Sequence, residues 1–511
     1  MAKLWIRKTY PWFAGALLAL TMPSGFHPLG NVVFVALLPA LLLRGRGHSF
    51  LYGWAFGIAF FAVDLRWLLT LWRFTPMVLP GYVVLVCFYG VLIAIWKSCV
   101  TRAERRLGPA TAFLLVSPLL WTFMEWIRAQ GSMGFGFSTL YSALYRTPVL
   151  IQGASVFGPW FVSASILLAA GGLALALRRR SFLPALMSLA TVGVLAAFSL
   201  VPVAPNDAGT APLTVAVIGS DVDQETKLEG RNLLDLRDRY LHLGMDASSV
   251  APDLVVFPES ILPGYILLDS RLLPHFEDLA RTLNASLLFG TGDLRDGRIY
   301  NTAVLLDEQG QIADRYDMIR LVPFGEWIPA RGFLDRIGAG DMVRSFLPLD
   351  VTRGTDSTPV SVYGTPICFE SSFPAITRGF AANGAEMLVV ITNDAWFAHS
   401  SELEAHFACA VFRAIETRRY LAQAANGGIS GIIDPRGSIL AETDSEVVRS
   451  ATVNLRHDRS LYVRWGEIPL LLGWIGAWTV WGVWRLGGSR IKRRRATEIN
   501  KKAPRSLSED A

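Results

Sequence analysis

Three short apolar runs in the middle of the chain each end in reactive or charged residues. They are Val255–Glu259, Leu321–Glu326 and Thr365–Glu370. The third run contains Cys368, and a thiol near a carboxylate provides the nucleophile and the base that a covalent catalyst needs. In such a catalyst the carboxylate takes the thiol proton and passes it to a leaving group. These runs therefore predict Cys368 as a nucleophile and Glu259 as its general base.

Cys368 follows an expected strand and precedes a helical pattern, so the start of that helix is expected to stabilise its thiolate. The alternative is an inert, buried cysteine, because free cysteines are among the most buried residues. Four cysteines are too few for a disulfide framework. Cys409 could pair with Cys368, but its place within a helical pattern of small residues favours packing. Packing is also the expectation for Cys87 and Cys99, which lie in an apolar segment.

The segment 212–456 alternates β-rich runs with amphipathic helices, which predicts a layered α/β domain. The expected strands are Leu213–Gly219, Asp253–Pro258, Ser286–Thr291, Thr302–Asp307, Val360–Cys368, Met387–Thr392 and Ile429–Asp434. The expected helices are Arg231–Met245, Pro274–Leu283, Phe373–Ala382 and Glu402–Ala425. In α/β sheets the loops at strand ends gather into one site, so this domain is expected to bring the three runs together.

Strongly apolar regions flank this domain, and the whole chain is 52% hydrophobic with a mean hydropathy of +0.37. Their apolar runs approach the ~20 residues that a helix needs to cross a bilayer. We expect spans near 10–23, 29–43, 50–72, 79–97, 109–127, 155–177, 181–201 and 467–485. The first two are short and interrupted at 22–25, so a re-entrant hairpin is an alternative there.

Basic residues recur in every second loop between the expected spans. They are Arg7 and Lys8, Arg44 and Arg46, Lys97 with Arg102, Arg105 and Arg106, Arg178–Arg180, and Arg490 with Lys492–Arg495. By the positive-inside rule these loops and both termini are cytoplasmic, so 212–456 faces the periplasm or exterior. That segment holds 33 acidic and 21 basic residues, a net charge of −12, whereas the whole chain carries +6. The basic excess therefore faces anionic lipids and does not indicate nucleic-acid binding.

Several strings in the chain carry a family resemblance when they are taken together. They are Phe257-Pro258-Glu259, Leu321–Glu326, Ile367-Cys368-Phe369-Glu370, Thr392–Phe397 and Asn426-Gly427-Gly428-Ile429. These strings resemble the nitrilase, or carbon–nitrogen hydrolase, superfamily. With the membrane layout, the chain is similar to the apolipoprotein N-acyltransferase family over nearly its whole length.

The resemblance implies an α/β nitrilase-like αββα sandwich inserted before the last helix of an all-α transmembrane bundle of about eight spans. The implied domains are a bundle of about seven spans at 1–211, a catalytic domain at 212–456, a final transmembrane helix at 457–487 and a basic cytoplasmic tail at 488–511. The implied location is the bacterial inner membrane, with the catalytic domain on its periplasmic side.

The resemblance also implies a two-step acyl transfer. Cys368 takes a fatty acyl chain from a phospholipid as a thioester and hands it to the α-amine of a diacylglyceryl-modified apolipoprotein. Glu259 acts as general base, and the supporting residues are Glu326, Glu370, Phe369, Asn393 and Trp396. The partners are thus phospholipid, apolipoprotein and bilayer, with no cofactor. Seven histidines without a His-x-x-x-His or His-Glu pair give no metal site, and we expect His406 to be a core or supporting residue.

One position departs from the family pattern in the site itself. The family has its catalytic lysine three residues before Leu321, where this chain has Met318. A thioether neither donates a hydrogen bond nor carries a positive charge. Since Lys227 is the only lysine of 212–456, the replacement cation is either Lys227 or an arginine. Arg320 lies on the same face as Met318 if the segment is extended, so we expect Arg320 to supply the charge; the alternative is a surface residue.

Milder departures occur near the other strings. They are Leu228, Phe369 and Ala398, where the family usually has Trp, Tyr and Gly. Trp327, Trp396 and Phe397 are candidates for a lipid-facing rim or, alternatively, for core aromatics. Two other functions stay open: a divergent membrane acyltransferase or amidase with another amine acceptor, and a catalytically silent paralogue that binds lipids or lipoproteins.

Overall fold

The computed structural model describes residues 2–23, 27–43, 47–203, 211–229, 232–338, 340, 350–476 and 479. The chain separates into two units, Met1–Gly466 and Glu467–Ala511, and the description below concerns the first. Of the expected last span, residues 468–476 are described and are helical. The expected tail at 488–511 and the basic residues Arg44 and Arg46 lie outside the described residues.

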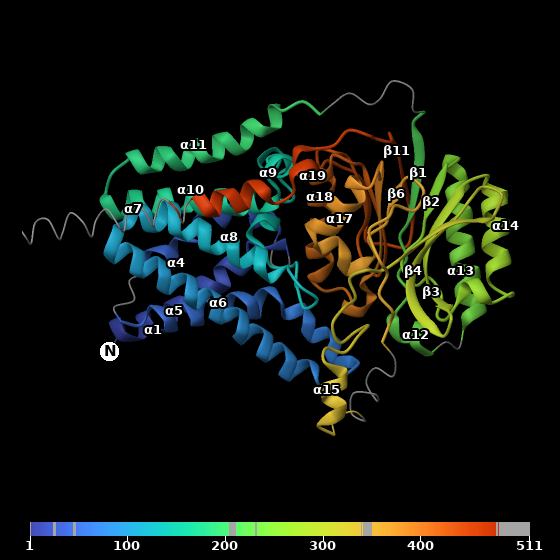
Figure 1. Ribbon diagram of the computed structural model, residues 1–511, viewed down its shortest axis with the longest axis horizontal. Helices are drawn as coiled ribbons and strands as arrows, with labels where there is room; N and C mark the ends of the chain where they lie inside the picture. The colour runs from blue at the N-terminus through green and yellow to red at the C-terminus, as the bar shows by residue number, and fades with distance from the viewer. Residues whose placement is uncertain are drawn as a thin grey trace, which may run out of the picture. The chain divides into compact units, whose positions relative to one another are not determined.

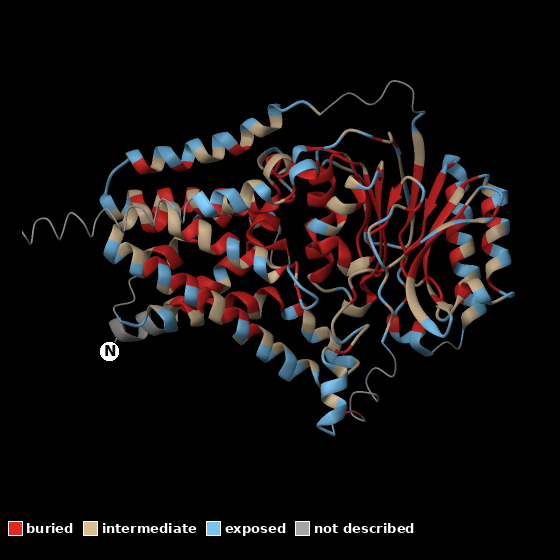
Figure 2. Ribbon diagram, in the orientation of Figure 1, coloured by how far each residue is buried: buried red, intermediate tan, exposed pale blue. Residues whose placement is uncertain are grey.

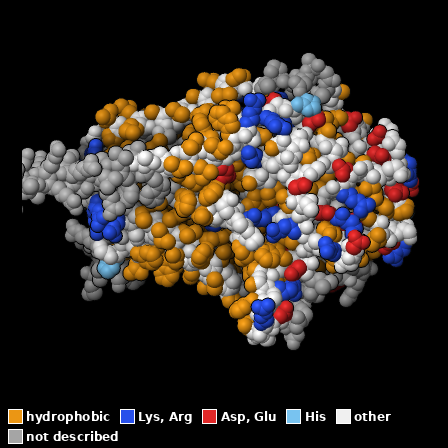
Figure 3. Space-filling view, in the orientation of Figure 1, with side chains coloured by type: hydrophobic (Ala, Val, Ile, Leu, Met, Phe, Trp, Pro, Cys, Tyr) orange, Lys and Arg blue, Asp and Glu red, His pale blue; other side chains and the backbone are white. Residues whose placement is uncertain are grey.

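The N-terminal part of the chain is helical. Its main elements are α1 (Ala2–Ala19), α5 (Ser49–Asp64), η2 (Arg66–Arg73), α6 (Val78–Leu107), α8 (Ser117–Arg128), α10 (Pro159–Arg179) and α11 (Leu183–Ala197). Within the described residues, four helices are long and apolar enough to cross a membrane, namely 78–107, 109–128, 159–179 and 183–200. A fifth results if α5 and η2, bent by 52°, form one broken span. Figure 3 shows hydrophobic side chains covering this region.

The remaining expected spans are not matched by helices of this kind. Segment 10–23 falls on α1, and segment 29–43 falls on the shorter apolar stretch Pro28–Leu42. Four helices, or five with the bent pair, meet the length and composition of a span among the described residues. The eight-span topology therefore stays a prediction.

Two β-sheets lie in the second half of the chain. The six-stranded sheet has the order β11-β1-β2-β3-β4-β5, and the five-stranded sheet has the order β10-β9-β8-β7-β6. The strands of the first are β1 (Leu213–Ile218), β2 (Leu254–Val256), β3 (Ser286–Arg295), β4 (Arg298–Leu306), β5 (Ile312–Asp317) and β11 (Val448–Val453). Those of the second are β6 (Tyr363–Gly364), β7 (Met387–Asn393), β8 (Leu421–Asn426), β9 (Ser430–Ile433) and β10 (Ile439–Thr443). The runs β1-β2-β3 and β6-β7-β8 are parallel.

Helices cover the outer face of each sheet. Helices α13 (Leu233–Asp246) and α14 (Leu273–Leu283) lie on the six-stranded sheet, and α17 (Pro374–Ala382) and α18 (Glu402–Thr417) lie beside the five-stranded one (Figure 1). In α14 the buried residues Phe276, Leu279 and Ala280 recur at i, i+3 and i+4, which is the apolar stripe of a helix packed on one side. Helix α18 is buried all round, because it lies between a sheet and the membrane helices (Figures 1 and 2). The expected αββα layering is confirmed.

One expected element is wrong in its second half. The helix predicted at Glu402–Ala425 ends at Thr417, and the chain then forms the central strand β8 beside β7. Arg418 has a φ of 56°, in the left-handed region that ends helices. Both α18 and β8 are buried on all faces, so neither shows the alternation of apolar and polar residues that distinguishes a helix from a strand.

Arg418 also joins the sheet domain to the membrane helices. Its guanidinium donates to the Gln152 side chain at 2.7 Å, to the Ser155 hydroxyl at 2.8 Å and to the Pro435 carbonyl at 2.9 Å. Arg418 is only 5% exposed, so these acceptors have little access to water if the guanidinium is lost. The contact ties the helix α9 (Ala154–Phe157) and the turn before it to the turn that follows β9.

We expect Arg418→Met to lower the free energy of unfolding by about 3 kcal/mol, because a methionine leaves several buried acceptors without a donor. The measurement is the thermal unfolding of the purified protein in detergent, followed by tryptophan fluorescence. Arg436→Met in the neighbouring exposed turn is the matched control and should melt close to the parent. Equal melting of both variants would contradict a structural role for Arg418.

Candidate active site

Glu259 and Cys368 reach the same site from opposite sheets. Glu259 follows β2 of the six-stranded sheet, and Cys368 follows β6 of the five-stranded sheet. The Cys368 thiol and the backbone N–H of Asn393 both face the Glu259 carboxylate closely enough to lower its pKa. Glu259 is 8% exposed, so the carboxylate faces protein rather than bulk water. The fold thus brings together the base and the nucleophile expected from the sequence.

Cys368 sits in an unusual backbone conformation and holds a neutral thiol. Its φ is 49°, which is uncommon for a residue with a side chain and is found at strained functional positions. Burial raises the pKa of the thiol well above its ordinary value, and the charges of Glu259 and Asp394 raise it further. Helix α17 begins only at Pro374, after the short helix η9 (Cys368–Ser372). The expected thiolate at a helix start is therefore replaced by a thiol that needs a base.

Asn301 links two carboxylates at this site. From β4 its side-chain amide donates to Glu259 Oε1 at 2.7 Å and to Glu326 Oε1 at 2.9 Å. The backbone N–H of Val322 donates to the other Glu326 oxygen at 2.8 Å. Met318 is 1% exposed, and its sulfur lies 3.7 Å from the same amide nitrogen. The position of the missing lysine therefore lies beside the bridge between the two carboxylates.

The paired carboxylates hold protons at higher pH than usual. Burial raises the pKa of Glu326 to about 7, and the nearby charge of Glu259 contributes in the same direction. Burial also raises the pKa of Glu259, against the hydrogen bonds from Asn301 and Cys368. Two close carboxylates in a buried site do not ionise independently. The pair is therefore expected to carry less than two negative charges near neutral pH.

Glu370 anchors the Cys368 loop to the loop after β5. It accepts hydrogen bonds of 2.8 to 2.9 Å from four groups: the Tyr316 hydroxyl and the backbone N–H groups of Ile319, Arg320 and Ile367. Burial nevertheless raises the pKa of Glu370 to about 8. With every acceptor direction used by the protein, Glu370 serves to position these loops.

The two cations considered for the site point to different places. The Arg320 guanidinium donates to the Ala129 carbonyl at 3.2 Å and lies 4.1 Å from the centre of the Phe373 ring. Lys227 is 4% exposed on the short helix α12 (Gln224–Glu229), and its ammonium donates to the carbonyl of Ser260 at 3.0 Å. Ser260 directly follows Glu259, so Lys227 lies at the turn that carries the base.

A second polar cluster supports the Cys368 loop from α18. Its core is His406, whose Nδ1 lies 2.9 Å from Asp394 Oδ1 and whose Nε2 lies 3.0 Å from the Cys368 carbonyl. Burial lowers the pKa of His406, but the charges of Asp394 and Glu402 outweigh it and raise the pKa to about 9. Ligand atoms of His406, Asp394 and Glu402 lie within 4.8 Å of one another and could hold a metal ion. The ion pair with Asp394 and the contact with the Cys368 carbonyl tie the Cys368 loop to α18.

The remaining expected site residues lie at two edges of this centre. Asn393 is buried and bonds to the side chains of Gln224 and Asn426 at 2.8 Å each. Phe369, Trp396 and Phe397 pair with aromatic rings of the N-terminal region, in η2 and in the segments that follow η2 and α8. These pairs are Phe369 with Phe137 at 6.2 Å, Trp396 with Phe74 at 5.0 Å and Phe397 with Trp67 at 4.9 Å. The aromatic residues thus line the junction between the sheet domain and the helical region.

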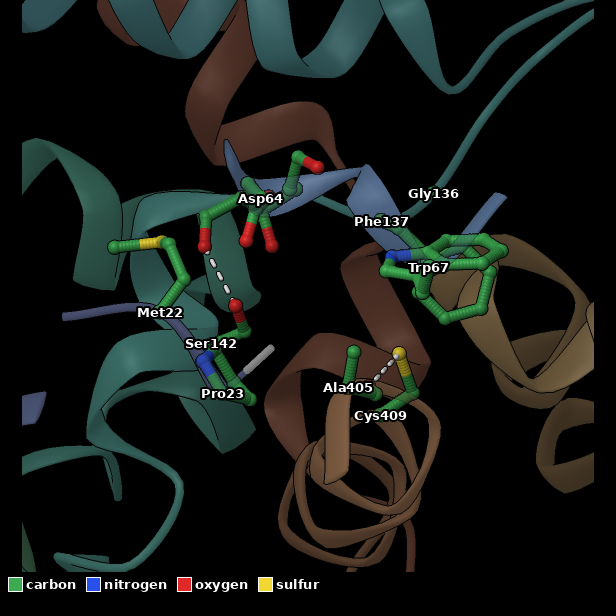
Figure 4. Close-up of a pocket in the computed structure, with 11 residues that line it drawn as sticks. Met22, Pro23, Asp64, Trp67, Gly136, Phe137, Ser142, Ala405 and Cys409 are labelled. Atoms are coloured by element: carbon green, nitrogen blue, oxygen red, sulfur yellow. Dashed lines mark hydrogen bonds between the residues drawn. The ribbon is translucent and has the colours of Figure 1, made fainter. Parts of the chain in front are cut away.

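Cys409 lies in a separate pocket on the membrane side of α18. Figure 4 shows it beside Ala405, with Asp64, Trp67 and Ser142 across the pocket. Its sulfur donates to the Ala405 carbonyl at 3.4 Å, and burial raises its pKa to about 12. Cys368 and Cys409 are both free thiols. The interpretation of Cys409 as a packing residue agrees with these surroundings.

Sequence reasoning missed three residues of the site: Asn301, Asp394 and Lys227 in its contact with Ser260. Asp394 lies within the string Thr392–Phe397, so the family resemblance of that string could have indicated it. Asn301 is a single amide inside a strand, and no pattern of the sequence points to it. Lys227 was weighed as a cation, but nothing in the sequence places α12 against the Glu259 turn.

The raised pKa of Glu326 makes stability depend on pH. A carboxyl whose pKa is higher in the folded protein contributes stability at low pH, and that contribution is lost as the pH rises through the folded value. For Glu326 the window runs from its ordinary 4.5 to about 7. Glu326→Gln replaces one accepting oxygen by an amide nitrogen, so we expect it to be less stable than the parent near pH 5. Toward pH 8 the difference should shift in favour of the variant, by up to about 1.4 kcal/mol for each pH unit of the window.

The measurement is the melting temperature of both proteins in detergent across this pH range. Glu308→Gln, at an exposed turn between β4 and β5, is the control and should follow the parent throughout. A constant difference between Glu326→Gln and the parent at all pH values would contradict a raised pKa at Glu326.

Comparison with known proteins agrees with this architecture. Residues 14–172 match the family model of the apolipoprotein N-acyltransferase N-terminal domain, and residues 214–459 match that of carbon-nitrogen hydrolase. The apolipoprotein N-acyltransferase of Geobacter metallireducens is 33% identical over 480 residues, which cover 89% of this chain and 91% of that protein. That of Allorhizobium ampelinum is 28% identical over 472 residues, with 84% and 85% covered.

Among solved structures, an amidase from Nesterenkonia sp. aligns with 19% identity and a TM-score of 0.39, covering 53% of this chain and 99% of the amidase. The two family models fall on the membrane helices and on the two-sheet domain. The resemblance noted from the sequence strings is confirmed over most of the chain, and the protein belongs to the apolipoprotein N-acyltransferase family of the carbon–nitrogen hydrolase superfamily.

Proposed function

We propose that this protein moves a fatty acyl chain from a phospholipid to the α-amine of the diacylglyceryl-modified cysteine of apolipoproteins. The observation that carries the proposal is that the Cys368 thiol and the buried Glu259 carboxylate lie close enough for each to shift the pKa of the other, in a chain of this family. A thiol next to a base can form a thioester, and two membrane-anchored substrates can then use one site in turn.

In the first step Glu259 takes the thiol proton while the Cys368 sulfur attacks the carbonyl carbon of a phospholipid ester. The carbon–sulfur bond forms, the ester carbon–oxygen bond breaks, and Glu259 returns the proton to the oxygen of the leaving lysophospholipid. Because the resting thiol is neutral, proton removal and attack must be coupled, which is the task of a general base within hydrogen-bond reach.

In the second step the α-amine of the acceptor attacks the thioester carbon. Glu259 takes a proton from the amine, the carbon–nitrogen bond forms and the carbon–sulfur bond breaks. The departing sulfur takes the proton back from Glu259, which restores the thiol. Glu326, Glu370, Asn393, Phe369 and Trp396 support this centre by holding Glu259, the Cys368 loop and the edge toward the membrane helices.

The membrane placement supports the same proposal. We place the chain in a bacterial inner membrane with 212–456 on the periplasmic side, because basic residues lie in the last turns of α6 and α10 while the sheet domain is acidic overall. The aromatic pairs of Phe369 with Phe137 and of Trp396 with Phe74 join the site to the N-terminal helical region, which supports a site near the bilayer. An acyl chain anchored in lipid would have a short way to Cys368 from there.

We expect the purified protein, incubated with phospholipid vesicles, to gain the mass of one fatty acyl chain on Cys368. Intact-mass analysis followed by peptide mapping locates the adduct. Cys368→Ala removes the nucleophile and should abolish the adduct, whereas Cys409→Ala removes a buried packing thiol and should keep it. No adduct on the parent, or an adduct on Cys368→Ala, would exclude the thioester step.

The acceptor is tested in cells depleted of their own apolipoprotein N-acyltransferase. Growth and N-acylated lipoproteins restored by the parent, and not by Cys368→Ala, would support the proposed acceptor. An adduct on Cys368 without restored lipoprotein acylation would favour a different amine acceptor. If the parent forms no adduct and restores no lipoprotein acylation, the results favour a catalytically silent paralogue that binds lipid. This is the alternative that Met318 raises.

A further inference from the structure

The candidate site is rich in buried carboxylates and lacks the cation that its family places at position 318. Glu259 and Glu326 share the amide of Asn301, and Asp394 adds to the negative field at Glu259. A neutral amide hydrogen-bonds to carboxylates but does not neutralise them. A base that must be ionised when the thiol approaches therefore needs a positive charge from elsewhere in the fold.

Two of the nearby cations are already engaged with other groups. The His406 imidazolium pairs with Asp394 at 2.9 Å. The Arg320 guanidinium contacts Ala129 and the Phe373 ring, at the side facing the membrane helices. In the part of the chain that the structure describes, neither His406 nor Arg320 forms a hydrogen bond or an ion pair with Glu259.

Lys227 is placed differently. Its ammonium donates to the carbonyl of Ser260 at 3.0 Å, directly beside Glu259, and it lies 5.7 Å from the centre of the Tyr240 ring. Gly290 packs under the same turn so tightly that a Cβ there would lie 2.6 Å from the Glu259 Cα, so the turn has little room to move. The Lys227 ammonium is thus fixed at the backbone turn that carries Glu259, near enough for the Glu259 charge to act on it.

The buried ammonium itself requires an opposite charge. Lys227 is 4% exposed, and a buried lysine without a partner loses its proton. Burial lowers the pKa of Lys227 to about 7; the charge of Glu259 opposes this, and that of Arg239 adds to it. Arg239 is in turn paired with Glu446, and the facing Tyr240 ring is uncharged. Glu259 is therefore the charge that favours the protonated form of Lys227 against the effect of burial.

We propose that Lys227 is the positioning cation of the site, which fixes the Glu259 turn through Ser260 and keeps the Glu259 carboxylate ionised for proton transfer from Cys368. This role rests on the proposed function, because it assumes that Glu259 acts as the base. It assigns to α12 the charge that the chain has lost at Met318, and it leaves Arg320 as a contact to the membrane helices.

The test is the pH dependence of Cys368 reactivity, measured in two ways on the full-length protein in detergent. One is the rate of acyl-adduct formation from phospholipid, and the other is alkylation by iodoacetamide mapped to the Cys368 peptide. Removing a positive charge raises the pKa of both Glu259 and Cys368, so both profiles should move to higher pH. We expect Lys227→Gln and Lys227→Met to shift the acidic limb of each pH–rate profile to higher pH by about one pH unit. At a given pH on that limb, this is about a tenfold loss of rate.

Matched variants separate charge from structure. Lys227→Gln keeps a hydrogen-bond donor for Ser260 without the charge, and Lys227→Arg keeps the charge, so its limb should stay with the parent. Arg320→Met removes a cation of the same domain and should leave the position of the limb unchanged. Adding Met318→Lys to Lys227→Gln places an ammonium beside the Asn301 bridge and should move the limb back toward the parent.

The outcomes are distinguishable. A lower rate without a shifted limb in Lys227→Gln would reduce Lys227 to a structural residue and overturn the inference, as would a limb that shifts in Arg320→Met instead. If the parent forms no acyl adduct at any pH, the proposed function fails, but the alkylation profile still decides the role of Lys227. If Lys227→Met does not fold, Lys227→Gln and its Met318→Lys double variant carry the same comparison.

Discussion

Keeping the buried Glu259 carboxylate ionised is the constraint on which the rest of the site depends. Burial favours the neutral acid, and the adjacent Glu326 and Asp394 work in the same direction. The fold opposes this with the Asn301 amide, the Asn393 N–H and the thiol of Cys368. Because these donors come from both sheets, the base is held only when the two sheets are packed together.

The need to hold the base in place also explains why buried side chains make several hydrogen bonds to the loops around the site. Glu370 fixes the loop that carries Met318 to the loop that carries Cys368, and His406 fixes the latter to α18. Helix α18 in turn packs against the membrane helices, and Arg418 bonds to Gln152 and Ser155 just beyond its end. Displacement of the membrane helices would therefore be transmitted to the nucleophile through few, buried contacts.

The sequence predicts this fold well where turn residues mark the ends of an element and poorly where none do. Strands β1, β2 and β7 and helices α13 and α14 appear near their expected bounds, since residues such as Gly219, Pro258 and Gly384 lie next to their ends. Strand β8 was taken for the end of α18 because both are buried throughout. At the site, the strings that end in Glu259 and Cys368 identified the reacting pair, whereas Asn301 depends on a register between β3, β4 and β5 that no local pattern specifies.

The cation is the clearest case of what spacing alone does not decide. Arg320 lies near Met318 along the chain, and an extended segment would have kept both side chains on one face. In the structure β5 ends at Asp317, and the backbone N–H groups of Ile319 and Arg320 turn toward Glu370. That turn directs the Arg320 side chain to the membrane helices, while Lys227, far away in sequence, meets the Glu259 turn because α12 packs beside the strand ends. The positive charge that is missing at Met318 is thus supplied by Lys227, which lies near Glu259 only in the folded protein.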